Sequence, residues 1–470
     1  MTFTPDLPVR VWQAGIAVAA LGVGVLAGID PVRSALAAAA LAVMLVVLGD
    51  LTLGLCLFAF LAFLDYHYPN IATLFVLALA MSWLGAVTAG GQRAREFVST
   101  HPAATWLISL LPAWAAMSLL WAEVAPPATS AAAKYAVNGA LFLIVYTAVK
   151  TRRHVVLVLG AFVLSAAFSA AYGLVAPAEA TGYSDDLERV SGPIGDPNAL
   201  ARVLVAGLVL AFLLAVIDVL SPVKRLIAAS AAFLCAAGLV LTASRGGLIA
   251  LVCALVAALV FSGRWRAQVT VLALAVGLLA VGYYAGIASP DARERITASD
   301  GGSGRTDLWR VGWQVVEDHP VLGAGAGNFG EVSKSYLGDA GLLRRSDLIV
   351  STSNVLHNTY LGTLVELGIV GACLLLMILG FSLGCLVRAA RTSMRADDVT
   401  MEILARGLLV ALVGILAADF FISEPYNKHL WLLLALCPAV LAVARDRSAP
   451  APEASVSSTI AGGRPVHALS

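Results

Sequence analysis

Apolar runs of about 20 residues recur along almost the whole chain, and this repetition constrains the fold more than any single motif. Each run is long enough to cross a hydrocarbon core of about 30 Å as a helix. Of the 470 residues, 60% are hydrophobic and 13% are charged, whereas soluble domains carry roughly 25% charged residues. The sequence therefore predicts an all-α, polytopic membrane helix bundle.

The apolar runs give 14 candidate spans on a generous count, and because several are short enough to be half-spans we expect about 12 true crossings. They are residues 11–29, 32–48, 51–64, 71–90, 104–121, 132–149, 154–175, 199–219, 226–242, 247–262, 268–287, 358–387, 403–422 and 429–444.

The distribution of polar residues divides the chain into four parts. We expect an N-terminal helix bundle at 1–287, one large polar loop containing helices at 288–356, and C-terminal transmembrane helices at 357–444. The tail at 445–470 is rich in Ala, Pro and Ser and is expected to be disordered.

The charges of the short loops predict the orientation. Pairs of Arg or Lys, such as those near 93–95, 150–153, 224–225, 264–266 and 388–395, lie in short loops that alternate with the segments of the opposite side. The large loop at 288–356 also holds many basic residues, but the positive-inside bias is counted on short loops. The positive-inside bias makes these basic loops cytoplasmic, which places the large loop on the outer face. Because the net charge is only +1, nothing favours a nucleic-acid partner.

Within the large loop, residues 306–318 have the periodicity of a helix, with Trp309 and Trp313 four positions apart. Such a helix either lies in the membrane interface or packs on the bundle. The glycine-rich segment that follows, HPVLGAGAGNFG at 319–330, lacks the preceding strand that a nucleotide-binding loop requires. We therefore interpret it as a turn.

His357 begins the motif HNTYLGTLVELGIVG at 357–371. The positive end of a helix macrodipole and nearby arginines both disfavour imidazolium, which leaves a neutral ring that can act as a general base. The alternative is a structural histidine. Glu366 lies nine positions further on, on the opposite helix face, so we expect a structural partner for it.

Three arginines on the outer side stand beside small residues. They are Arg189 in RVSGPIGDPNALA (189–201), Arg245 in TASRGGL (242–248) and Arg305 in GSGRTDLW (302–309). A guanidinium binds phosphate oxygens bidentately, so the three suit a lipid diphosphate. Snorkelling to headgroups is the alternative for each. The metal-binding motifs H-E-x-x-H and D-x-D are missing from the sequence, so we expect a metal-independent reaction and no cofactor.

Taken in order, these motifs resemble the O-antigen ligase and polymerase superfamily of bacterial inner-membrane proteins. The resemblance is carried by residues 189–371. It implies a GT-C-like, periplasm-facing glycosyltransferase that takes a glycan from undecaprenyl diphosphate. For a ligase, the acceptor is the lipid A-core and the product is lipopolysaccharide.

The resemblance also implies roles for individual residues. His357 matches the essential histidine and candidate base, Arg245 and Arg305 match essential arginines at the donor diphosphate, and Arg189 is a less direct match to the same group. A further acidic position of the family corresponds to Asp419 or Glu424, and the spacing does not choose between them.

We predict an inverting O-antigen ligase in the inner membrane, with an undecaprenyl-diphosphate glycan, lipid A-core and membrane lipids as partners. An O-antigen polymerase or a protein O-oligosaccharyltransferase uses the same donor, although the latter usually extends beyond a short tail such as the one after Arg445. A lipid or solute transporter is the alternative from another class. It would place ionisable residues at the membrane midplane and show repeated halves.

Overall fold

The computed structural model describes residues 31–65, 69–88, 92–175, 189–297, 305–338 and 355–448. Within these ranges the regular elements are helices, with no strand, which confirms the predicted all-α class. The predicted span 11–29, parts of the large loop and the end of the tail lie outside the described residues.

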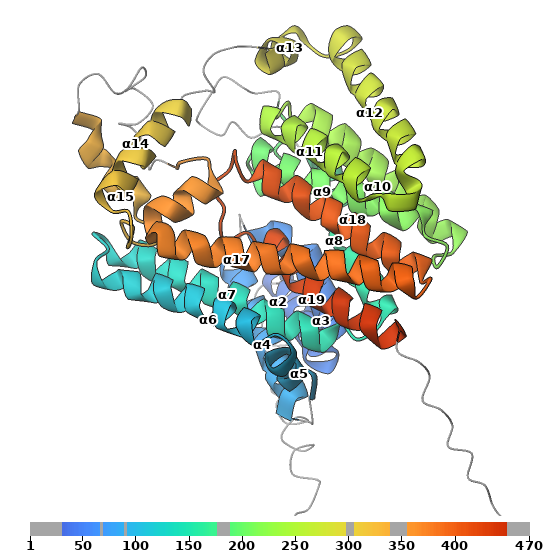
Figure 1. Ribbon diagram of the computed structural model, residues 1–470, viewed down its shortest axis with the longest axis horizontal. Coiled ribbons are helices and arrows are strands. Elements are labelled where there is room, and N and C mark those ends of the chain that lie inside the picture. Colours follow the sequence, from blue (N-terminus) through green and yellow to red (C-terminus); the bar gives the residue numbers. More distant parts are fainter. Residues whose placement is uncertain are drawn as a thin grey trace, which may run out of the picture.

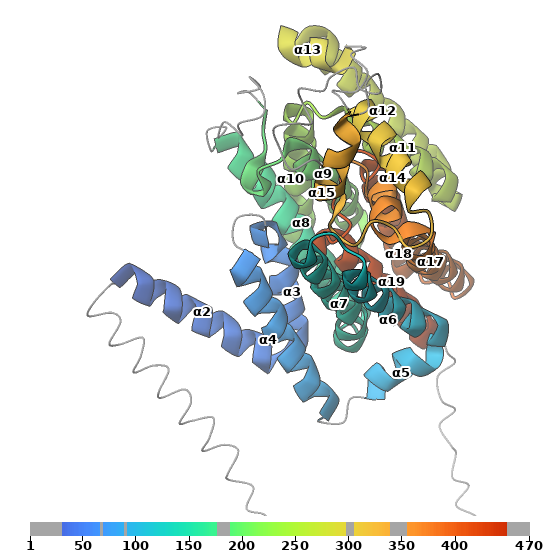
Figure 2. The ribbon, with the colours of Figure 1, turned by 90° about the vertical axis from the view of Figure 1, so that its left-hand side faces the viewer.

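The first half of the chain contributes the following helices: α2 (Pro31–Gly49), α3 (Leu51–Leu61), η1 (Ala62–Asp65), α4 (Pro69–Thr88), α5 (Gln92–Thr100), α6 (Pro102–Met117), η2 (Ser118–Leu120), α7 (Ala125–Ala148), α8 (Arg152–Val175), η3 (Gly192–Ile194), α9 (Pro197–Val216) and α10 (Pro222–Leu241). In the view turned by 90°, α2 lies at an outer edge of the bundle, where it contacts α3 and α4 (Figure 2).

The second half contributes α11 (Arg245–Phe261), η4 (Gly263–Trp265), α12 (Arg266–Gly286), α13 (Pro290–Thr297), α14 (Arg305–Asp318), α15 (Phe329–Val332), η5 (Ser333–Gly338), α17 (Thr359–Arg395), α18 (Val399–Ala418) and α19 (Lys428–Ser448). Helices α6, α7 and α17 run side by side, and α14 and α15 pack near the start of α17 (Figure 1).

Nine helices of the described part are long and apolar enough to cross a membrane, and three shorter apolar helices accompany them, at 51–61, 75–88 and 245–261. The multi-pass architecture is therefore confirmed, whereas the count of about 12 crossings stays a prediction. The most buried spans are α9, α18 and α19, which form the centre of the bundle. Helix α12 is the opposite case, since none of its side chains is buried.

The polar segments that matter for function gather at one end of this bundle. We call it the site end, where α9, α11, α17 and α19 begin and α10 and α18 end. At the other end, Glu402 forms ion pairs with Arg264 (2.6 Å) and Arg406 (2.9 Å), and Asp398 forms one with Arg447 (2.5 Å). Charged residues thus gather mainly at the two ends of the bundle, and the spans between these ends are mostly apolar.

Helix α17 is broken near its start, although the sequence suggests one continuous span at 358–387. Gly368 has φ 64° and ψ −170°, which separates a short half-helix from the long remainder. Three carbonyls before the break accept hydrogen bonds from outside the helix: Val365 from the Ala324 amide (2.8 Å), Glu366 from the Gly325 amide (2.9 Å) and Leu367 from the Trp114 indole (2.9 Å). Irregular backbone at membrane depth is tolerated when protein groups satisfy it in this way.

The segment predicted as a helix at 306–318 is α14, and it packs on the bundle. Its Trp309 indole donates to the Leu356 carbonyl (2.9 Å), and Val311 and Val315 are buried with Val365 of α17. Trp313 remains exposed. Packing against α17, rather than insertion into a membrane interface, accounts for these contacts.

The prediction that the tail becomes disordered at Arg445 is wrong for its first residues. Helix α19 continues to Ser448, and Arg447 pairs with Asp398 between α17 and α18. Basic side chains at a helix C-terminus are stabilised by the macrodipole, which favours this extension. Residues 449–470 lie outside the described part of the chain.

Candidate active site

His357 lies immediately before α17, with its backbone in the left-handed region (φ 51°). A positive φ is unusual for a residue that has a Cβ, and such positions occur often at functional sites. The next residue, Asn358, is the N-cap of α17 and accepts hydrogen bonds from the amides of Tyr360 and Leu361 (both 3.0 Å). The capped helix therefore fixes the histidine at its positive end, as the sequence predicts.

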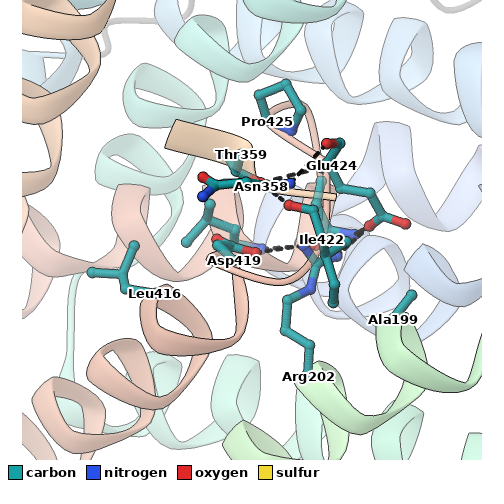
Figure 3. A network of polar contacts seen from close by, with 12 residues as sticks. Ala199, Arg202, Asn358, Thr359, Leu416, Asp419, Ile422, Glu424 and Pro425 are labelled. Carbon is teal, nitrogen blue, oxygen red and sulfur yellow. Dashed lines mark hydrogen bonds and ion pairs between the residues drawn. The ribbon is translucent and has the colours of Figure 1, made fainter. Parts of the chain in front are cut away.

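The loop between α18 and α19, residues 419–427, holds this start of α17 in place (Figure 3). Four hydrogen bonds join the two segments: Asn358 N to Ser423 Oγ (3.1 Å), Thr359 N to Asp419 O (2.9 Å), Thr359 Oγ1 to Ile422 O (2.6 Å) and Glu424 N to Thr359 Oγ1 (3.2 Å). The position of His357 is consequently set by a loop that lies more than 60 residues away in the sequence.

The surroundings of His357 favour its neutral form. Burial lowers the pKa of the ring below its usual 6.5, the charge of Arg305 lowers it further, and the charge of Asp196 opposes both. A neutral imidazole near physiological pH can accept a proton. Two of the predicted residues, His357 and Arg305, are thus close enough to interact electrostatically.

Arg305 is the first residue of α14 and is partly buried. Because α14 packs on α17 through Trp309 and Leu356, the arginine is held on the same side of the bundle as the histidine.

Arg189 is tied to the turn between α10 and α11. Its Nε donates to the Thr242 carbonyl (2.9 Å) and its Nη2 to Asn198 Oδ1 (3.4 Å). The same Asn198 oxygen accepts a hydrogen bond from Ser244 (2.8 Å). These contacts anchor the guanidinium to protein groups and connect its loop with the residue before Arg245.

Arg245 is the first residue of α11, which is capped by the Ser244 side chain at the Gly247 amide (3.1 Å). Gly246 packs so closely on Phe421 that an added Cβ would lie 2.9 Å from the Phe421 Cβ. The start of α11 therefore adjoins the same 419–427 loop that holds His357. All four sequence-predicted residues lie at the site end of the bundle.

Sequence reasoning missed Arg202, which is 1% exposed inside α9. Its guanidinium pairs with Asp419 (2.8 Å) and with Glu424 (Figure 3). Both acids that the sequence left as alternatives therefore meet one cation. An arginine within an apolar span is costly unless it is paired, and this signal could have identified it.

Glu366 has the structural partners that its position predicts. Its carboxylate accepts hydrogen bonds from the Gly327 amide (2.8 Å) and the Tyr426 hydroxyl (3.4 Å). The glycine-rich segment 319–328 therefore wraps the break in α17, which agrees with its interpretation as a turn. Its three glycines Gly323, Gly325 and Gly327 have positive φ and make these close approaches possible.

Together, the fold and these contacts define a polytopic helical membrane protein with a partly buried histidine and several guanidinium groups at one end. Comparison with protein families identifies the class further. Residues 230–376 match the family described as O-antigen ligase, which confirms the resemblance to that superfamily. The match includes Arg245, Arg305 and His357, whereas Arg189 and Arg202 precede it.

A comparison with curated proteins found no match. The family indicates a glycosyltransferase of the ligase or polymerase type, acting on lipid-linked glycans. Together with the apolar helices, it also indicates a multi-pass protein of the inner membrane.

Proposed function

We propose that this protein is an O-antigen ligase, which transfers the O-antigen glycan from undecaprenyl diphosphate to the lipid A-core at the periplasmic face of the inner membrane. The observation that carries the proposal is the placement of His357 at the start of α17, where it is partly buried and within electrostatic range of Arg305, in a segment that matches this family. A neutral base and a phosphate-binding cation beside each other suit glycosyl transfer from a diphosphate.

In the proposed step, His357 accepts the proton of an acceptor hydroxyl group. The hydroxyl oxygen forms a bond to the anomeric carbon while the bond from that carbon to the diphosphate oxygen breaks, so the anomeric configuration inverts. Arg245 and Arg305, with Arg189 near them, stabilise the negative charge that develops on the leaving diphosphate. The step needs no nucleotide, because the diphosphate linkage of the donor supplies the driving force.

The test is transfer by purified protein that is supplied with the lipid-linked glycan and either lipid A-core or a second lipid-linked glycan. We expect extension of lipid A-core, and a His357→Ala loss of roughly 10²–10⁴-fold in kcat, the usual contribution of a general base. His319→Ala is the matched control, since His319 is an exposed histidine in the same half of the chain. Wild-type transfer by His357→Ala protein would remove the proposed mechanism.

Arg305→Lys tests the phosphate-binding role. The lysine keeps the positive charge but lacks the planar guanidinium that donates two parallel hydrogen bonds to a phosphate. We therefore expect slower transfer. Arg310→Lys on the same helix is the control, because Arg310 is exposed and pairs with Asp307 (3.0 Å).

Extension of only the second lipid-linked glycan would assign a polymerase instead. Movement of lipid without transfer to either acceptor would favour the transporter class.

A further inference from the structure

A second polar site lies against the 419–427 loop. It is a cavity of about 730 Å³ between α4, α7, α9 and α19, and the loop residues Ser423 and Glu424 line it. None of the four sequence-predicted residues lines this cavity. Its size falls within the range of ligand-binding cavities, roughly 300–1,000 Å³.

The charge of the cavity wall is positive. Lys134, Arg202 and Lys428 line it, with Glu424 as the one carboxylate among its described lining residues. Arg202 is already neutralised by Glu424 and Asp419. Lys134 and Lys428 add two ammonium groups to the wall, and cationic groups of this kind attract an anion.

Lys134 is an unusual residue for its position. It lies in the membrane-spanning helix α7, nine residues after Ala125, which is about 14 Å along the helix axis. Its ammonium group stands over the Tyr426 ring, 5.4 Å from the ring centre. An ionisable residue inside a span marks a functional site more often than a structural one.

Two buried groups at the same cavity lack a hydrogen-bond partner among the described residues. They are Nε of Arg202 and Nε2 of His429, on side chains that are 1% and 3% exposed. The guanidinium Nε is always a donor, and a buried donor without an acceptor is destabilising. Both side chains line the cavity, so its wall keeps unused hydrogen-bonding capacity.

We propose that this cavity binds a phosphate group of a lipid substrate, separately from the guanidinium groups near His357. Lysines bind phosphate as point charges, and Asn138 and Ser423 add neutral hydrogen-bonding groups to the wall. Val76 and Leu77 of α4 provide an apolar wall, which suits the hydrocarbon part of a lipid. The chemistry fits the diphosphate of the donor and the phosphates of an acceptor glycolipid. This assignment of the ligand to a substrate rests on the proposed function.

The experiment measures equilibrium binding to full-length protein by native mass spectrometry. The probes are the undecaprenyl-diphosphate-linked glycan, phosphorylated lipid A-core, its dephosphorylated form and phosphatidylglycerol. The test protein carries Lys134→Gln with Lys428→Gln. Lys150→Gln with Lys224→Gln, two exposed lysines outside the cavity, is the matched control.

We expect the test protein to bind one of the two phosphorylated glycolipids about tenfold more weakly, since charge-assisted hydrogen bonds are lost. The glycolipid affected identifies the source of the phosphate. Lys134→Arg with Lys428→Arg is expected to bind normally. Because no turnover is measured, His357→Ala protein should also bind normally, which separates this result from failure of the transfer reaction.

Unchanged affinity for both phosphorylated glycolipids would overturn the proposal. An equal loss for dephosphorylated lipid A-core, or a loss confined to phosphatidylglycerol, would do the same. Should the double variant melt well below the wild type, the two single variants replace it, each expected to weaken binding in the same direction by a smaller factor.

Discussion

The pKa of His357 depends on three features from different parts of the chain. Burial before α17 and the charge of Arg305 on α14 lower it, and the charge of Asp196 before α9 raises it. The charge of Arg305 could be predicted, because the arginine motifs are visible in the sequence, which otherwise attributes the neutral ring to the helix macrodipole and not to burial. The contribution of Asp196 could not, since only the packing of α9 brings it near. Asp196 also caps α9 by accepting from the amides of Asn198 (2.7 Å) and Ala199 (2.8 Å).

This arrangement predicts how transfer depends on pH. A general base is active when neutral, so kcat/KM should fall on the acid side only below pH 6.5, because the pKa of His357 is lowered from that value. Asp196→Asn keeps a capping oxygen but removes the charge that raises the pKa, so the acid limb should move to lower pH. Arg305→Gln removes a charge that lowers it, so the limb should move up, toward pH 6.5.

For each variant, kcat/KM is plotted against pH, and the pH of the acid limb is compared after scaling to that variant's own plateau. The scaling is needed because Arg305→Gln should also lower the plateau value of kcat/KM. Asp218→Asn, an exposed acid at the other end of the bundle, is the control and should leave the limb in place. Shifts in the same direction for both site variants would contradict this account of the pKa.

Among the elements, α17 has some features that could be predicted from the sequence and one that could not. Its span and the structural role of Glu366 could be predicted from hydropathy and helical periodicity. The break at Gly368 could not, because a glycine in an apolar run is compatible with a straight helix. The break exists because the segment at 320–325, which is distant in sequence, supplies hydrogen bonds in place of those that the helix loses.

Gly368→Ala should therefore be strongly destabilising. A Cβ at this position would lie 2.1 Å from the Val321 carbonyl oxygen, and φ is 64°. We expect the free energy of unfolding to fall by about 3 kcal/mol or more, the sum of backbone strain and overpacking. Gly380→Ala on the same helix has open space around it and should change the stability by less than about 1 kcal/mol. Thermal or denaturant unfolding in detergent measures both, and equal effects would contradict the role of the break.

At the scale of the whole molecule, the sequence predicts the polytopic helical architecture because long apolar runs permit few other folds. It does not predict that α9 meets the loop after α18, where Arg202 joins Asp419 and Glu424. Such a contact depends on how the spans are arranged around one another, and hydropathy carries no information on neighbours. The cation-lined cavity was missed for the same reason, since its walls come from four helices.

The orientation of the bundle is open to a direct test. The positive-inside bias predicts that the site end faces the periplasm. In a cysteine-free background, Thr306→Cys on α14 should react with a membrane-impermeant thiol reagent added to intact spheroplasts. Lys224→Cys at the other end should react only after lysis. Both positions are exposed, so access decides the result. The reverse pattern would place the histidine in the cytoplasm and exclude the proposed reaction.

At the break in α17, hydrogen bonds to the glycine-rich segment replace those of the helix. This dependence of two distant segments on each other matters for protein engineering. The glycine-rich segment 319–328 and the helix start at 357–368 complete each other's backbone, so neither retains its shape without the other. A chimera that exchanges acceptor specificity between related ligases would have to transplant both segments together, and one that moves either alone should misfold before its specificity can be measured.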